Sequence, residues 1–221
     1  NDTQRSALPH IRTLRIEPLD DAITIDAASR ANLELERNLQ GGAEQTLASI
    51  LDSTVTGMGS RTLRRWINRP LRTLDTLNQR QATVAALSAH QSADVRSILS
   101  GCADVERINA RIAMGSARPR DLTGLRDTLA QLPSLVAALA PIDEAGLNAL
   151  ARQIAPQPVL SERLQAALIE QPPVVLRDGG VIASGYDPTL DELRDLSRNA
   201  DGFLTDLEAR ERQATGINTL K

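Results

Sequence analysis

The sequence predicts a mainly α-helical protein: a multi-helix core bundle with a small N-terminal β-hairpin and one long C-terminal helix. Three observations support this prediction. The first is that the 221 residues include only three aromatic ones, Trp66, Tyr186 and Phe203, so aliphatic side chains must form the core. Leu- and Ala-rich cores favour helices over sheets. Second, apolar residues after position 46 recur at spacings of three and four, which is typical of helices. Third, residues 188–216 contain no helix breaker except Gly202.

The N-terminal segment has the pattern of two strands. Residues 10–16 alternate between apolar and polar side chains, and Asp20 and Asp21 mark a turn before residues 22–25. This pattern predicts a β-hairpin. Two strands alone are marginally stable in water, so we expect the hairpin to pack against helices.

Helices are expected to follow one another from residue 26 onward. Asp26 or Ser29 can cap the first, Asp104 can cap a later one, and Pro119 suits the first turn of another. The expected helices cover residues 26–35, 46–51, 60–67, 74–87, 104–114, 119–132, 144–154 and 159–169. Their expected inward-facing residues include Leu74, Leu77, Gln81, Val84 and Leu87, then Val105, Ile108, Ile112 and Met114, then Leu122, Leu125, Leu129 and Leu132. Residues 174–183 are expected to form an extended link.

The C-terminal segment is predicted to be a single helix of about 43 Å. It carries a narrow heptad seam made of Leu193, Leu196, Ala200, Phe203 and Leu207. A seam of this width suits one partner helix, although it also allows simple packing on the bundle. Residues 187–212 hold eight acidic residues and four arginines, a composition that repels a phosphate backbone.

Few residues offer chemistry. Cys102 is the only cysteine, which excludes an internal disulfide and, with only His10 and His90 as histidines, a zinc cluster. Lys221 is the only lysine, so no P-loop lysine precedes it. Cys102 is expected to be a small packing residue. The acidic pairs Asp20/Asp21 and Asp191/Glu192 are expected to be solvated, because adjacent helical residues point in different directions.

Two further motifs have competing interpretations. The stretch from Asp178 to Tyr186 contains glycines but lacks the lysine and hydroxyl of a phosphate-binding loop, so a turn is favoured. The arginine clusters at 61–65 and 118–120 can contact phosphates or pair with carboxylates. Carboxylate pairing is favoured, because the net charge is −3. We therefore expect no catalytic, cofactor-binding or metal-binding residues and no enzyme activity from this chain alone.

Localisation is expected to be cytoplasmic. The sequence has no run of about 18 apolar residues, and residues 1–10 lack the apolar core of a signal peptide. These observations also predict no membrane association.

Several stretches, in their order and separation, resemble the MutS family of DNA mismatch-repair proteins. They are residues 25–35, 46–52, 57–70, 104–108, 119–122 and 185–194. The third stretch has the sequence Gly57-Met58-Gly59-Ser60-Arg61-Thr62-Leu63-Arg64-Arg65-Trp66 and ends at Pro70. The resemblance spans almost the whole chain.

The resemblance implies the core and lever region of a longer, multidomain protein. Residues 1–10 would be the tail of the preceding connector, residues 11–186 a helical core with short β elements, and residues 187–221 an ascending lever helix cut off before the clamp. It implies that the mismatch-binding, clamp and ATPase domains lie outside this chain. The role it implies for the chain itself is to link the nucleotide-binding domain to the DNA-gripping clamp.

The implied partners are those missing domains, mismatched double-stranded DNA, a homodimer partner and a downstream repair protein of the MutL type. ATP and Mg²⁺ are implied only for the full-length protein. The alternative is a self-sufficient helical protein-interaction module that dimerises through its C-terminal helix.

Overall fold

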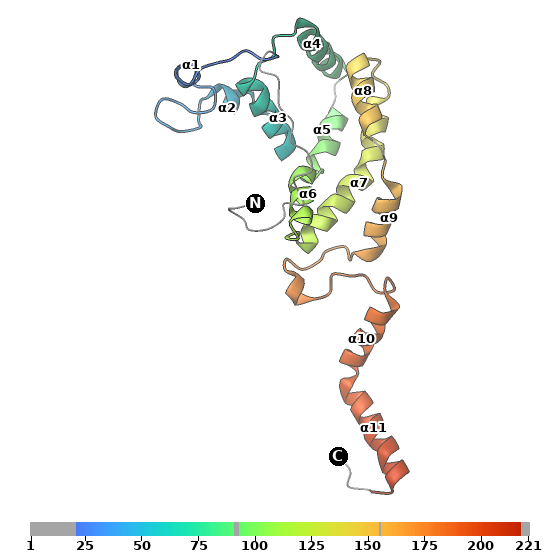
Figure 1. Ribbon diagram of the computed structural model, residues 1–221. Helices are drawn as coiled ribbons and strands as arrows, with labels where there is room; N and C mark the ends of the chain where they lie inside the picture. Colours follow the sequence, from blue (N-terminus) through green and yellow to red (C-terminus); the bar gives the residue numbers. More distant parts are fainter. Residues whose placement is uncertain (1–20, 91–92, 155, 218–221) are drawn as a thin grey trace.

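The prediction of a mainly helical protein is confirmed. The computed structural model describes residues 21–90, 93–154 and 156–217, and in this part of the chain the regular structure is helical apart from two isolated antiparallel bridges, Ala22–Leu71 and Leu168–Ile182 (Figure 1). The helices are α1 (Ala27–Asn32), α2 (Leu47–Leu51), α3 (Gly57–Asn68), α4 (Leu74–Ala89), α5 (Ala93–Ser100), α6 (Val105–Ala113), α7 (Pro119–Leu139), α8 (Ala145–Gln153), α9 (Pro158–Ala167), the short 3₁₀ helix η1 (Leu176–Asp178), α10 (Pro188–Arg198) and α11 (Ala200–Thr215).

Polar side chains fix where many of these helices begin. Asp26 accepts a hydrogen bond from the Ser29 backbone N–H at 3.0 Å, and Asp104 accepts one from the Arg107 N–H at 3.2 Å. The Asp104 cap was predicted, and Asp26 was one of the two residues, with Ser29, expected to cap the first helix. Pro119 occupies the first turn of α7, where its missing N–H costs nothing, as expected. Further caps are Thr46, Thr56, Glu144 and Asp187.

The main core is aliphatic. Leu135, Leu139, Ile142 and Leu147, from α7, α8 and the loop between them, are buried together. Side chains from α4, α5 and α8 pack around them, namely Ala86, Leu87, Val95, Ile98, Leu99, Ala151 and Ile154. Leu, Ile, Val and Ala therefore supply this core, as the lack of aromatic residues predicts.

The N-terminal hairpin is not shown. Its first strand, residues 10–16, lies outside the described residues, as does most of its turn. In the second strand, Ala22 forms a bridge with Leu71, and the Ile23 N–H donates to the Pro70 carbonyl at 2.8 Å. The described backbone of this segment therefore pairs with the connection between α3 and α4.

Some expected helix details are wrong. Ile108 is buried as expected, but Ile112 and Met114 are 43% and 55% exposed, and Leu74 and Val84 of α4 are 71% and 60% exposed. Helix α5 was not predicted, although Val95, Ile98 and Leu99 have helical spacing. Helix α7 was expected to end near residue 132 but continues through Pro133 to Leu139.

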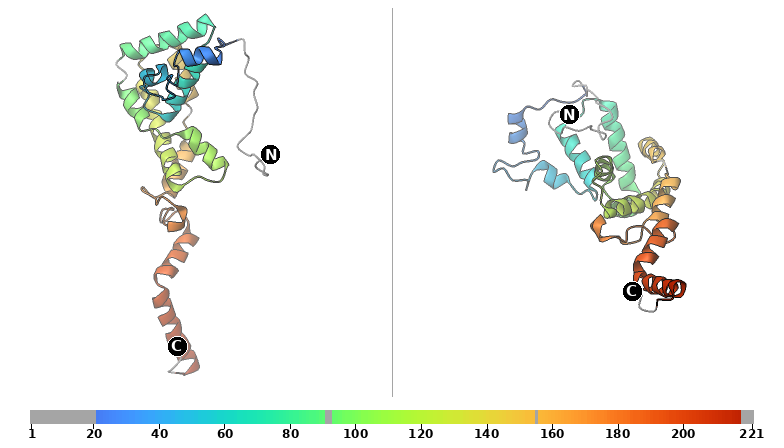
Figure 2. Two further views of the ribbon diagram at one scale, coloured as in Figure 1. Left: turned by 90° about the vertical axis from the view of Figure 1, so that its left-hand side faces the viewer. Right: turned by 60° about the horizontal axis from the view of Figure 1, so that its bottom comes forward.

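The C-terminal segment differs from the single helix that was predicted. Helices α10 and α11, which we call the arm, extend away from the rest of the molecule in every view (Figures 1 and 2). They are separate because Asn199, at φ −105° and ψ 21°, leaves the helical conformation. Asparagine has weak helix propensity since its side chain competes for backbone hydrogen bonds. Gly202, the suspected breaker, lies inside α11.

Candidate functional site

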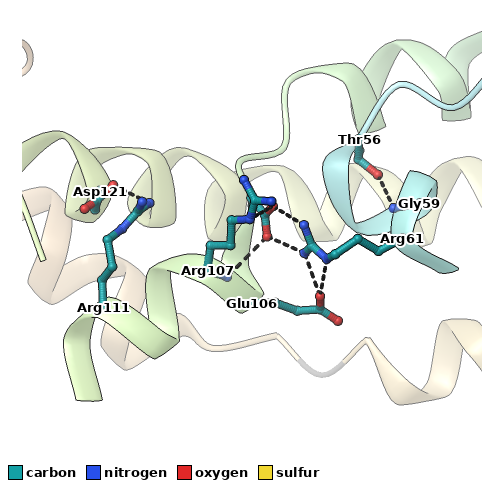
Figure 3. A network of polar contacts seen from close by, with 8 residues as sticks. Thr56, Gly59, Arg61, Glu106, Arg107, Arg111 and Asp121 are labelled. Carbon is teal, nitrogen blue, oxygen red and sulfur yellow. Dashed lines mark hydrogen bonds and ion pairs between the residues drawn. The ribbon is translucent and has the colours of Figure 1, made fainter. Parts of the chain in front are cut away.

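An ion-pair cluster joins α3 to the start of α6. The Arg61 guanidinium donates to both oxygens of Asp104, at 2.7 Å each, and to the Glu106 carboxylate at 2.6 Å (Figure 3). Two parallel bonds between a guanidinium and a carboxylate fix orientation as well as distance. Arg61 therefore holds α3 in a defined orientation against α6.

Asp104 serves two elements at once. It caps α6 through the Arg107 N–H, and it receives the guanidinium of Arg61. The hydrogen bonds from Arg61 are the largest cause that lowers the pKa of Asp104 from 3.8 to about 2. The same contacts raise the pKa of Arg61. Both groups are therefore charged at neutral pH.

A second arginine of α3 contacts the α1–α2 region. Arg64 lies 3.6 Å from the Glu36 carboxylate and 3.9 Å from that of Asp52. Asp52 also accepts hydrogen bonds from the hydroxyls of Ser60 and Thr54, and these lower its pKa. The expected carboxylate pairing is thus confirmed for two arginines of the 61–65 cluster.

The 118–120 cluster is arranged differently. The Arg120 side chain donates to the Pro172 carbonyl at 3.4 Å, and neither Arg118 nor Arg120 pairs with a carboxylate of the described residues. The expected pairing is therefore wrong here. Asp121 instead accepts a hydrogen bond from Arg111 of α6 at 2.7 Å (Figure 3). It also accepts one from the Arg118 backbone N–H at 2.9 Å.

Helix α7 is connected to the segment that leads to the arm. Arg126, only 7% exposed, donates to the backbone carbonyl of Ile169 at 3.2 Å. The Ile169 N–H in turn donates to the Val181 carbonyl at 3.1 Å. Residues 167–170 and 181–183 therefore run side by side, anchored to α7 by a buried arginine.

The base of α10 is attached to the same segment. Arg194 donates to the Ile182 carbonyl at 2.9 Å and pairs with Asp191 at 3.2 Å. Asp191 also accepts the Gly185 N–H at 2.6 Å. We define the arm junction as Arg126, residues 167–170 and 181–185, Asp191 and Arg194. It is a continuous set of polar contacts from α7 to the first turns of the arm.

The predicted seam lies along the arm. Leu193 and Leu196 are on α10 and are 59% and 51% exposed, while Leu207 on α11 is 38% exposed. Ala200 and Phe203 belong to α11, and the position of their side chains lies outside what the structure describes. Leu204, also on α11 and 55% exposed, is a further apolar residue that the seam did not include.

A groove of about 690 Å³ lies at the break in the arm. Leu196, Asn199 and Gly202 line it together with three acidic side chains, Glu192, Asp195 and Asp206. The break at Asn199 thus combines an apolar seam residue with a concentration of negative charge.

The remaining sequence candidates have structural roles. The Cys102 thiol is half-buried and lies 3.5 Å from the Ile98 carbonyl, and burial raises its pKa, which opposes nucleophilic reactivity. Asp191 and Glu192 diverge, the first toward Arg194 and the second toward the groove. His90 is exposed at the end of α4, and Gly179 and Gly180 form a turn with φ of 71° and 65°. His10 and Asp20 lie outside the described residues.

Within the described ranges, no group of histidine, cysteine or acidic side chains is arranged to hold a metal ion. No described helix is long and apolar enough to cross a bilayer. The polar side chains that converge do so between helices, where they fix one helix against another. The described part of the chain is therefore a helical body with a projecting arm.

The comparison with protein families agrees with this description. The family model of MutS domain III matches residues 28–217, which is most of the chain. The chain therefore belongs to the MutS family of DNA mismatch-repair proteins.

Proposed function

We propose that this chain is the structural and allosteric core and lever segment of a DNA mismatch-recognition ATPase. In this proposal it links the nucleotide-binding domain of the complete protein to the clamp that grips DNA. Membership of the MutS family and the division into a packed body and a projecting arm support the proposal.

The arm junction is the observation that carries the proposal. Arg126 on α7 and Arg194 on α10 both donate to the backbone between them, at 3.2 Å and 2.9 Å. A displacement of α7 would therefore turn the base of the arm. Coupling between distant sites requires an element with discrete arrangements that both sites bias. A stiff arm that moves as a rigid body meets that requirement.

The seam has a proposed occupant. The exposed leucines Leu193, Leu196 and Leu207 fit the helix that returns from the clamp in a lever pair. The acidic residues around the groove at the break favour basic side chains on that helix.

The residues of this chain do not fit an ATP–Mg²⁺ site. The turn at Gly179 and Gly180 lacks a lysine, and the described residues offer no carboxylate cluster for a metal. We therefore propose that the ATPase activity resides in another domain. Mismatched double-stranded DNA, a homodimer partner and a MutL-type repair protein are proposed partners of the complete protein.

Charge substitutions on the seam test the proposal. In the complete protein, Leu196→Glu and Leu207→Glu should slow ATP-triggered release of DNA by about tenfold or more while hydrolysis changes less than about twofold, because the seam transmits motion. Stopped-flow DNA release and steady-state hydrolysis measure the two effects.

The matched control is Leu204→Glu, the same substitution at a leucine outside the predicted seam. Leu196 and Leu207 are 51% and 38% exposed in this chain, so a charge at either position should leave the chain folded. Equal losses of release and hydrolysis, or equal effects of the control, would show that the seam has no part in coupling.

The second candidate is a self-sufficient module that dimerises through the C-terminal helix. The exposed seam leucines favour it as much as they favour a lever helix. Sedimentation of the chain over a range of concentrations separates the two. A dimer that persists on dilution and is lost in Leu196→Glu would support the module.

A further inference from the structure

The chain's single tryptophan lies at the surface where α3, α4 and α8 meet. Trp66 is 42% exposed, and the guanidinium carbon of Arg80 lies 3.8 Å from the centroid of its ring. Such stacking is a cation–π contact, which holds the flat face of the guanidinium against the indole. It leaves the edge of the guanidinium, where the N–H donors are, available for another group.

Two hollows flank this stacked pair. One, of about 470 Å³, is lined by Leu71 and Leu77, and the other, of about 450 Å³, by Leu87 and Leu150. Both hollows include Trp66, Arg80 and Val84. Arg80 and Val84 lie one turn apart on α4 and form a row along the helix. Because successive residues are about 100° apart, the other α4 residues of the first hollow lie on one side of this row, and those of the second hollow lie on the other side. We call this double hollow the Trp66 groove.

The Trp66 groove is apolar and open. Val84 is 60% exposed and Leu150 is 51% exposed, although both lie beside well-packed helices. Helices α4 and α8 are fixed against each other by the Thr83 hydroxyl, which donates to the Glu144 carboxylate at 2.9 Å. The groove is therefore formed by elements that are already held together.

Arg80 supplies the charge. It is the only charged residue that lines either hollow. Among the described residues it makes no ion pair with a carboxylate, and its contact is the stacking on Trp66. A guanidinium edge between two apolar hollows is complementary to a carboxylate flanked by two apolar side chains.

We propose that the Trp66 groove binds an acidic amphipathic helix of a partner protein. Two apolar side chains of that helix enter the two hollows, and a carboxylate between them pairs with Arg80. Side chains at positions i, i+4 and i+7 share one helix face, so a Leu-x₃-Glu-x₂-Leu pattern satisfies the groove. This binding surface is separate from the arm and its seam.

Fluorescence of Trp66 tests the proposal directly, since the chain has no other tryptophan. The probe is a synthetic helix-forming peptide, about 16 residues long, with Leu, Glu and Leu at i, i+4 and i+7. The comparison peptide has Lys in place of Glu. The Glu peptide should shift Trp66 emission to shorter wavelength saturably, and the Lys peptide should bind about tenfold more weakly or worse.

Two variants assign the effect to the guanidinium. Arg80→Gln should reduce the preference for the Glu peptide to within about twofold, because the charge that distinguishes the two peptides is lost. Arg96→Gln, at an exposed position of α5, should keep the full preference. Circular dichroism checks that both variants retain their helices.

Three results would overturn the proposal. One is equal binding of the two peptides, or no saturable change with either. Another is a preference that survives in Arg80→Gln. The third is an emission shift that follows protein concentration together with dimer formation, which would assign the groove to a second copy of the chain.

Discussion

At the scale of single residues, one carboxylate joins two parts of the body. Asp104 caps α6 and receives both terminal nitrogens of Arg61 from α3. Its side chain is 22% exposed, so water competes for it only partly. The Asp104 side chain therefore supports a helix start and a helix–helix contact together.

The pKa of Asp104 predicts a pH dependence. Because the folded state lowers this pKa from 3.8 to about 2, the carboxylate stabilises the fold fully above about pH 4, and its contribution is lost as the pH falls toward 2. Asp104→Asn keeps a side chain that can cap α6 but loses the charge that pairs with Arg61, so it should lower the free energy of unfolding at pH 7 by about 1 kcal/mol. In urea unfolding, the free energy of unfolding of the variant should be lower than that of wild type by the same amount between pH 7 and pH 5. This difference should become smaller below pH 4.

Glu106→Gln is the matched control for that prediction. Glu106 contacts the same arginine but is 67% exposed, so the ion pair is weaker and the loss should be smaller. A difference between Asp104→Asn and wild type that does not change with pH would contradict the assigned role.

At the scale of elements, α4 and α8 meet through a shared carboxylate. Glu144 accepts the Gly146 and Leu147 N–H groups at 2.9 Å and 2.8 Å, which caps α8, and it accepts the Thr83 hydroxyl from α4. A side chain at Gly146 would overlap Thr83 Oγ1. A side chain at position 146 would therefore have to displace the Thr83 hydroxyl of α4.

Gly146→Ala tests this contact. The substitution should lower the free energy of unfolding by about 1–3 kcal/mol, since the added methyl group displaces Thr83 from Glu144. In a Thr83→Ala background the same substitution should be neutral or stabilising, because alanine favours a helix over glycine by about 1 kcal/mol. Thermal or urea unfolding of wild type, the two single variants and the double variant gives the coupling free energy between positions 83 and 146. Additive effects would mean that Thr83 and Gly146 do not compete for space.

Much of the element order could be predicted because it depends on local chemistry. Asp26, Asp104 and Pro119 act at helix starts through their own side chains or ring. The break at Asn199 could not be predicted in this way, because asparagine is only weakly unfavourable in a helix. A proline such as Pro133 indicates a helix end when only the sequence is considered. In the structure Pro133 is exposed and lies inside α7, and the helix continues through it because the turns on either side are packed.

The candidate site was predictable only in part. The seam leucines and the preference of Arg61 and Arg64 for carboxylates follow from spacing and net charge. The arm junction depends on backbone carbonyls at Ile169 and Ile182, which side-chain patterns do not reveal. The Trp66 groove requires Trp66, Arg80 and Leu150 to come together from distant parts of the chain, so only the fold could show it.

At the scale of the whole molecule, a packed body carries a projecting arm. Residues 187–212, which include most of the arm, hold eight acidic residues and four arginines, a balance that disfavours contact with the phosphate backbone of DNA. Arginines of the body such as Arg61, Arg64 and Arg126 are engaged by carboxylates or backbone carbonyls. This distribution agrees with the proposed role of the segment, which is to transmit motion between other domains.

The most direct test of this account is fluorescence anisotropy of labelled DNA duplexes, one matched and one mismatched, titrated with the chain at low and moderate salt. A segment that transmits motion should bind neither duplex, or bind both weakly, with an affinity that falls as salt rises and without preference for the mismatch. Tight binding that favours the mismatched duplex would show that this segment reads DNA itself, and would contradict the account.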